Sequence, residues 1–239
     1  MSDAFSITID GTEVPARVGQ TVIEAADAAG LYIPRLCYLP GLEPAGACRV
    51  CTVLVHGRPQ AACIQPVVRG MVVVSDTAEL RAWRKGVVEM LLVEGNHFCM
   101  ACERSGACEL QATAYRLGVT APRHPYLHKR RGLDASHPDV LVDFNRCIRC
   151  GRCVRASQQV DRKSVFGFVG RGAATALAFD GPALAATDLS ADDRAASVCP
   201  VGCILRKRVG FAVPVGERPY DRRPIGSDVE ARRGRGGAR

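Results

Sequence analysis

CYLPGLEPAGACRVCTVLVHGRPQAAC, residues 37–63, places four cysteines in one loop-rich segment, here called the first group: Cys37, Cys48, Cys51 and Cys63. A two-iron, two-sulfide cluster needs four thiolates around a small rhomb. A long loop that carries a Cys-x2-Cys pair and is closed by a distant cysteine can supply them. Four cysteines also suit tetrahedral zinc. Zinc ribbons usually carry two short Cys-x2-Cys knuckles and this segment has one, so the spacing favours a [2Fe-2S] cluster.

The residues before this loop predict a hairpin followed by a helix. Residues 5–9 alternate apolar and polar side chains, Asp10 and Gly11 form a strong hairpin turn, and residues 14–18 can return as a second strand. Thr21 and Glu24 have the spacing of a capping box at a helix start. This order of hairpin, helix and cysteine loop resembles a small β-grasp ferredoxin domain, which we expect over residues 1–75.

A second helix is expected from the caps at residues 75–77 to about Glu94. Leu80, Trp83, Val87 and Leu91 recur at helical spacing and predict one buried stripe that serves core packing. This helix opens a second, helical domain, expected over residues 76–125.

Three cysteines follow that helix, and with the neighbouring imidazole they form the second group: His97, Cys99, Cys102 and Cys108. Three thiolates leave a [4Fe-4S] cube one ligand short, and His97 is the only imidazole close by in sequence. A neutral imidazole in place of a thiolate makes a cluster less negative and raises its potential, as in Rieske centres. A water molecule or a more distant side chain is the alternative fourth ligand.

The third group lies in a ferredoxin-like domain expected over residues 126–206 and comprises Cys147, Cys150, Cys153 and Cys199. A short strand at 139–144 leads into it. The Cys-x2-Cys-x2-Cys run and the later Cys-Pro step match bacterial ferredoxins, which wrap a [4Fe-4S] cube in this way. Ser157 stands where two-cluster ferredoxins carry a further cysteine, so one cube is expected here. Cys203 could compete as the fourth ligand, but the Cys-Pro context favours Cys199, and Cys203 is interpreted as a small buried thiol.

Composition sets the class of protein. The 239 residues carry a net charge of +8, are 47% apolar, and include 12 cysteines. The apolar runs are too short for a membrane span, and the first residues lack a secretory signal. We therefore expect a cytoplasmic, reducing location, where cysteines more often bind metals than form disulfides. The fold class expected from the mixed elements is α+β.

The final segment, residues 207–239, is a basic tail, expected to anchor a partner or to be disordered. Its Gly/Arg-rich end, residues 231–239, has nothing to bury. A zinc-binding nucleic-acid module is a minority alternative supported only by this tail and the Cys-x2-Cys units. Basic and aromatic residues are not interleaved, so we expect no nucleic-acid partner.

Arginines inside the third group allow two interpretations. Arg149 and Arg152 stand between its cysteines and could offset the negative charge of a cluster. They could equally be solvated loop residues of little energetic weight.

Over about its first 205 residues the chain resembles the amino-terminal electron-transfer module shared by the large iron-sulfur subunit of complex I, [FeFe] hydrogenases, and the diaphorase small subunit of NAD-reducing [NiFe] hydrogenase. All three cysteine groups occur in the same order. The stretches EGNHFC (94–99) and SGACELQ (105–111) are particularly similar to the diaphorase subunit. One departure is that the ligand histidine of complex I and [FeFe] hydrogenases lies four residues before the first cysteine, whereas His97 lies two before Cys99.

This resemblance implies an iron-sulfur electron-transfer subunit of an NAD-reducing hydrogenase, which catalyses H2 + NAD+ to NADH + H+. One [2Fe-2S] and two [4Fe-4S] clusters would sit in this chain. FMN and NAD would sit on a flavin-binding diaphorase large subunit, and the [NiFe] hydrogenase small and large subunits would be the other partners. The alternative is the equivalent subunit of an NAD-dependent formate dehydrogenase or a complex I-like NADH dehydrogenase. No catalytic acid, base or nucleophile is expected within the chain.

Overall fold

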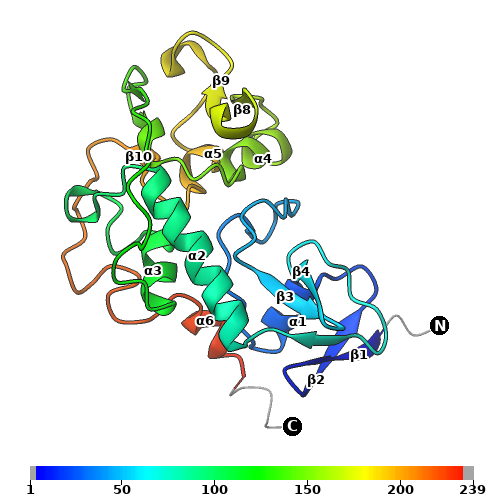
Figure 1. The fold of residues 1–239 in the computed structure, drawn as a ribbon. Helices are drawn as coiled ribbons and strands as arrows, with labels where there is room; N and C mark the ends of the chain where they lie inside the picture. The colour runs from blue at the N-terminus through cyan, green and yellow to red at the C-terminus, as the bar shows by residue number, and fades with distance from the viewer. Residues whose placement is uncertain (1–3, 234–239) are drawn as a thin grey trace.

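The computed structural model describes residues 4–233, and they form a mixed α+β fold (Figure 1). The first part is a five-stranded sheet in the order β2-β1-β5-β3-β4, in which only the β1–β5 pair is parallel. Its strands are β1 (Ala4–Ile9), β2 (Thr12–Arg17), β3 (Thr52–Val55), β4 (Arg58–Ala61) and β5 (Val72–Val74). The expected hairpin is confirmed, with positive φ at both turn residues, Asp10 and Gly11.

Helix α1 (Val22–Ala28) packs on this sheet, and its start has the capping chemistry that the sequence predicts. Glu24 Oε2 accepts hydrogen bonds from Thr21 N at 2.8 Å and from Thr21 Oγ1 at 2.9 Å. Just past the helix, Gly30 has a φ of +72°, which glycine adopts without steric cost. Apolar side chains of the sheet and of α1, among them Ile9, Val14 and Ile23, make up the first hydrophobic core.

Helix α2 (Ala78–Glu94) is capped by Thr77, whose Oγ1 accepts from Leu80 N at 3.1 Å. The predicted buried stripe is wrong in detail, because Trp83 is 41% exposed, whereas Leu80, Arg84 and Val88 are buried. The buried face is therefore rotated about the helix axis relative to the apolar stripe.

The reason for this rotation is the environment of Arg84, which is only 3% exposed. Its Nε donates to Val50 O at 3.1 Å, and its Nη2 donates to Thr52 O at 2.8 Å and Ser75 O at 2.7 Å. Three of the five N–H donors of this buried guanidinium are paired with carbonyl oxygens, so a charged side chain takes a position that periodicity assigns to apolar ones.

The remaining elements surround the second and third groups. Helices α3 (Glu109–Arg116), α4 (Arg152–Gln159) and α5 (Arg194–Ser197) accompany a three-stranded sheet and a two-stranded sheet. The strands are β6 (Leu133–Asp134), β7 (Val140–Asp143), β8 (Phe166–Val169), β9 (Ala176–Phe179) and β10 (Ile204–Arg206), and the short 3-10 turns are η1 (Cys99–Ala101), η2 (Phe144–Arg146), η3 (Gly172–Ala174) and η4 (Leu184–Ala186). A second hydrophobic core runs without a break from the loop after α1 through α2 and α3 to the third group.

The segment that was expected to be a basic tail folds back over the molecule up to Arg233. Tyr220 N donates to Gly106 O at 2.9 Å, and the segment ends near α1 with α6 (Ser227–Glu230) (Figure 1). Arg116 of α3 forms an ion pair with Glu230 and donates to Ile225 O at 2.8 Å. We call residues 207–233 the strap; residues 234–239 of the expected disordered end lie outside the described residues.

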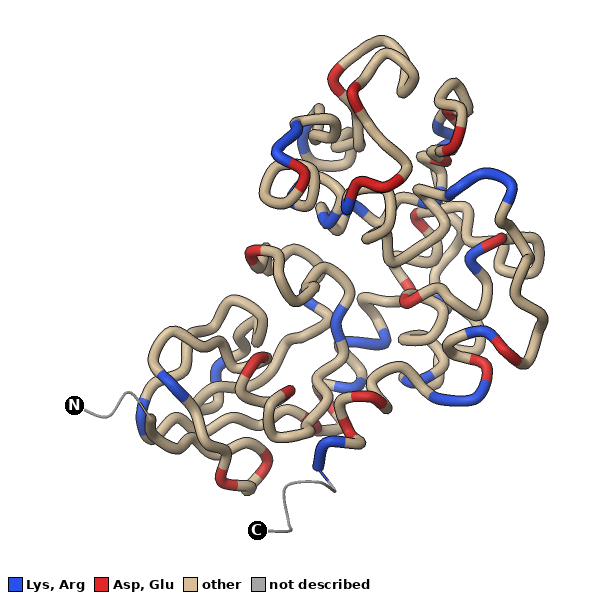
Figure 2. The backbone as a smooth tube through the Cα atoms, turned by 180° about the vertical axis from the view of Figure 1, so that it is seen from behind, with Lys and Arg blue, Asp and Glu red and all other residues tan. Residues whose placement is uncertain are grey.

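Stretches of acidic and of basic residues lie close to one another along much of the backbone (Figure 2). Within residues 4–233, no helix is long and apolar enough to cross a membrane.

Candidate metal centres

The structure brings the four cysteines of the first group together. Cys37 N lies 3.4 Å from Cys48 Sγ, and Cys48 N lies 3.5 Å from Cys37 Sγ. The thiols of Cys48 and Cys63 both hydrogen-bond to the Cys37 sulfur and lower its pKa, and Cys63 also hydrogen-bonds to Cys51. The four sulfur atoms thus form one continuous set, and four soft thiols are the donors that an iron-sulfur cluster needs.

A glycine allows this loop to close. Gly46 has a φ of +63°, and a Cβ atom there would lie 2.7 Å from Ile64 Cδ1. Any larger residue would meet both a steric contact and a strained backbone. The positive φ therefore favours glycine at this position between Cys37 and Cys48.

The second group surrounds a small cavity that is lined by all four expected residues, His97, Cys99, Cys102 and Cys108. His97 follows the end of α2, Cys99 begins η1, and Cys108 is the N-cap of α3. The end of α2, the turn η1 and the start of α3 together place the four donors around this cavity.

His97 has the properties that a metal ligand needs. Its Nε2 is buried and has no hydrogen-bond partner among residues 4–233. Burial, with a smaller effect of the Arg146 charge, lowers the pKa of His97 to about 4, so the ring is neutral at pH 7. A neutral imidazole with a free nitrogen is the form that coordinates metals. The shorter spacing to Cys99 thus does not keep His97 away from the cysteines.

The third group also lines a small cavity, and it contributes Cys147, Cys150, Cys153 and Cys199 to the wall. Apolar side chains close it, including Phe168 of β8 and Leu177 of β9. Gly151, at a φ of +69°, turns the chain between the second and third cysteines. Ser157 serves the fold, since its Oγ accepts from Val165 N at 3.1 Å.

Sequence reasoning placed Cys203 in the interior but not in this cavity. Cys203 is 1% exposed and lines the same wall, and its thiol hydrogen-bonds to the sulfurs of Cys147 and Cys199. The spacing of Cys199 and Cys203 in CPVGC was the signal that could have placed both sulfurs at one site. Five thiols therefore face the third cavity.

The two arginines of the third group have different environments. Arg149 pairs at 2.5 Å with Glu94, which is half exposed. Arg149 therefore fits the interpretation as a solvated loop residue. Arg152 is 1% exposed and pairs at 2.6 Å with Glu109. Of these two side chains, Arg152 is the one that is buried beside the third group.

No group of three or more His, Cys, Asp or Glu side chains in the described chain is arranged to hold a single metal ion.

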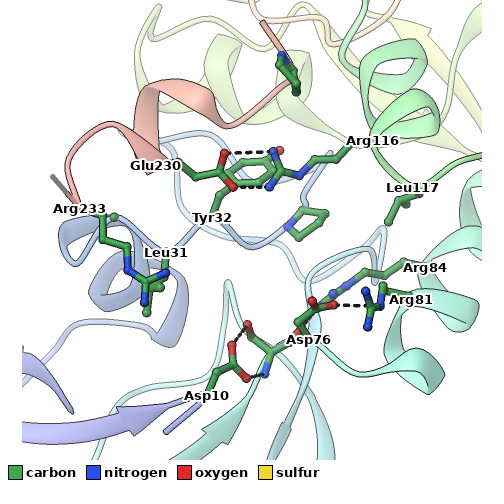
Figure 3. A pocket seen from close by; sticks show the side chains of 14 residues that line it. Asp10, Leu31, Tyr32, Asp76, Arg81, Arg84, Arg116, Leu117, Glu230 and Arg233 are labelled. Carbon is green, nitrogen blue, oxygen red and sulfur yellow. Dashed lines mark hydrogen bonds and ion pairs between the residues drawn. The ribbon is translucent and has the colours of Figure 1, made fainter. Parts of the chain in front are cut away.

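A separate hollow lies between the first sheet, α2 and the strap (Figure 3). Three of the arginines that line it are engaged: Arg116 with Glu230, Arg81 with Asp76 at 3.3 Å, and Arg84 with backbone carbonyls.

Comparison with protein-family models divides the chain into three matched regions. Residues 2–78 match a 2Fe-2S iron-sulfur cluster binding domain. Residues 84–123 match the NADH-ubiquinone oxidoreductase-G iron-sulfur binding region, and residues 137–205 match the ferredoxin-like domain of NADH-quinone oxidoreductase subunit 3. Each match contains one of the three groups.

The NAD-reducing hydrogenase HoxS subunit gamma of Cupriavidus necator is 38% identical over 219 residues, which cover 91% of this chain and 94% of that protein. The chain belongs to this hydrogenase subunit family. It is an iron-sulfur electron-transfer subunit of an oxidoreductase. A crystal structure of an NAD+-reducing [NiFe]-hydrogenase in the H2-reduced state contains a chain that is 45% identical to this chain. The two superpose with a TM-score of 0.92 over 96% of this chain and 98% of that chain.

More distant relatives of this chain are longer proteins. The mitochondrial NADH-ubiquinone oxidoreductase 78 kDa subunit of Candida albicans is 36% identical over 90% of this chain, which spans 30% of that subunit. The NADPH-Fe(3+) oxidoreductase subunit alpha of Geobacter sulfurreducens is 33% identical over 86% of this chain, which spans 24% of its length.

Proposed function

We propose that this chain conducts electrons through three clusters, between a flavin subunit that binds FMN and NAD and the small and large subunits of a [NiFe] hydrogenase. The first group would hold one [2Fe-2S] cluster, and the second and third groups would hold one [4Fe-4S] cluster each. The proposed ligands are Cys37, Cys48, Cys51 and Cys63, then His97, Cys99, Cys102 and Cys108, and finally Cys147, Cys150, Cys153 and Cys199. Bound clusters supply one-electron redox chemistry, and the chain's own side chains hold and bury them.

The observation that carries this proposal is the direct contact between the second and third groups. A Cβ atom on Gly202, in the turn after Cys199, would lie 2.7 Å from Cys102 Sγ. Glu109 N, beside Cys108, donates to Pro200 O at 2.8 Å. Electron tunnelling falls steeply with distance, so ligand loops that touch one another support transfer between their cofactors.

The first and third groups are also in contact. Arg155 of α4 donates through Nη2 to Cys37 O at 2.7 Å and to Cys150 O at 3.2 Å. The Arg155 side chain thus joins the backbone of Cys37 in the first group to the backbone of Cys150 in the third group. The three groups would form one connected route rather than three isolated sites.

The domain limits proposed from the sequence remain 1–75 for a β-grasp ferredoxin domain, 76–125, and 126–206. The mixed sheet with α1 on it supports the first of these. The strap, with the residues beyond it, is proposed to anchor a partner, and a cytoplasmic location remains a prediction. Within the route, the role of this chain is to position clusters and exclude water and oxidants from them.

The test is the iron and acid-labile sulfide content of anaerobically purified protein, with electron paramagnetic resonance before and after dithionite reduction. We expect about ten iron atoms and the signals of one [2Fe-2S] and two [4Fe-4S] centres. About six iron atoms would mean that one cube is absent. Zinc without sulfide would overturn the proposal. In the assembled complex, either H2 or NADH should reduce the same signals.

A further inference from the structure

A buried ion pair lies where the three groups meet. Arg152, the first residue of α4, pairs with Glu109 through both carboxylate oxygens, at 2.6 Å from Nη1 and 2.7 Å from Nη2. The same Nη2 donates to Tyr38 O at 2.8 Å. This bidentate geometry uses the rigid fork of a guanidinium, which lysine cannot reproduce.

We call the contact between Arg152, Glu109 and Tyr38 the junction. Each of these residues is adjacent in sequence to a cysteine of a different group. Tyr38 follows Cys37 of the first group and Glu109 follows Cys108 of the second. Arg152 immediately precedes a cysteine of the third. A single guanidinium therefore holds together the loops of all three groups, at a point that solvent hardly reaches.

One donor of this guanidinium remains unused. Arg152 Nε is buried and has no acceptor among the residues that the structure describes. The positive charge interacts with Cys150 and Cys199, so the side chain lies beside the third group. An unpaired buried N–H group is costly, and cluster and thiolate sulfurs are acceptors that this site would offer.

We propose that Arg152 tunes the reduction potential of the third-group cluster, while Glu109 opposes and orients it. This inference rests on the proposed function. Reduction adds one electron and one negative charge to the cluster, and a fixed positive charge nearby favours that form. Hydrogen bonds to cluster sulfurs act in the same direction. Arg152 therefore raises the potential of this cluster, and the Glu109 carboxylate lowers it.

Substitutions of Arg152 and Glu109 should shift the reduction potential in opposite directions, which distinguishes this role from a merely structural one. Arg152→Gln removes the positive charge, leaves the carboxylate, and should lower the potential. Glu109→Gln leaves the positive charge without its counter-ion and should raise the potential. Damage to the junction alone would cause loss of the cluster, or shifts without this reversal. Arg149→Gln is the matched control, because Arg149 stands between cysteines of the same group but pairs at the surface.

The experiment is a redox titration of the full holoprotein and the three variants, followed by electron paramagnetic resonance of the third-group cluster. At a fixed potential we expect the reduced-to-oxidised ratio to change at least tenfold in opposite directions for the two junction variants, which is 59 mV for a one-electron couple. The control should titrate like the wild type.

Equal potentials in all four proteins, or shifts of the same sign in both junction variants, would overturn the inference. If Arg152→Gln fails to retain the cluster, Glu109→Gln decides the matter alone: a raised potential supports the inference and an unchanged one refutes it. A wild-type protein without this [4Fe-4S] signal would instead refute the proposed function.

Discussion

Substitution of Gly202 by alanine tests the contact between the second and third groups. A Cβ atom at this position would lie 2.7 Å from Cys102 Sγ and 3.2 Å from Arg146 Nη1. The first distance is roughly 0.7 Å short of ordinary van der Waals contact, and the sulfur atom cannot move freely once it is a ligand. Gly202 is not among the glycines with positive φ, so the backbone itself accepts alanine.

Overpacking of this kind costs about 1–3 kcal/mol, which corresponds to roughly 5- to 150-fold weaker retention of the strained group. We expect the loss to fall on the second-group cluster, because Cys102 belongs to it. The assay is iron release to a chelator from anaerobic holoprotein, with the spectrum of each [4Fe-4S] centre followed separately.

Gly132→Ala is the matched control, since a Cβ atom there has nothing within 4 Å. It should lose iron at the wild-type rate. If Gly202→Ala retains its second-group cluster as well as this control does, the turn after Cys199 does not press against Cys102. The contact proposed as the link between the two cubes would then be refuted.

Arg84→Met should lower the free energy of unfolding by about 3 kcal/mol, because three buried carbonyls lose a charged donor. Arg81→Met on the same helix should change it by less than about 0.5 kcal/mol, since Arg81 is exposed; equal midpoints in denaturant unfolding would contradict this. Cys203→Ala should leave about ten iron atoms per chain, and a loss of about four would make Cys203 a ligand of the third cube. Thr21→Ala should weaken the start of α1 by about 1 kcal/mol, and unchanged amide hydrogen exchange over 22–28 would argue against the capping box.

Local features were predictable because they depend on residues close together in the chain. The Asp10-Gly11 turn and the Thr21 cap involve neighbours within a few residues, and both appear as expected. The apolar stripe on α2 failed at Trp83 because the orientation of a helix depends on what it packs against. Arg84 finds its acceptors 9 to 34 residues away in sequence.

The sequence by itself determined the three cysteine groups, their order and the kinds of cluster they suit, because ligand spacing within a short loop limits the geometry that the sulfurs can reach. Only the tertiary structure decided that Cys203 joins the third cavity, that the strap returns to α3, and that Arg152 meets Glu109 at the junction. These contacts join segments far apart in sequence. They depend on how the hydrophobic cores bring these loops together, and a pattern of residues close together in the chain does not specify which distant segments meet.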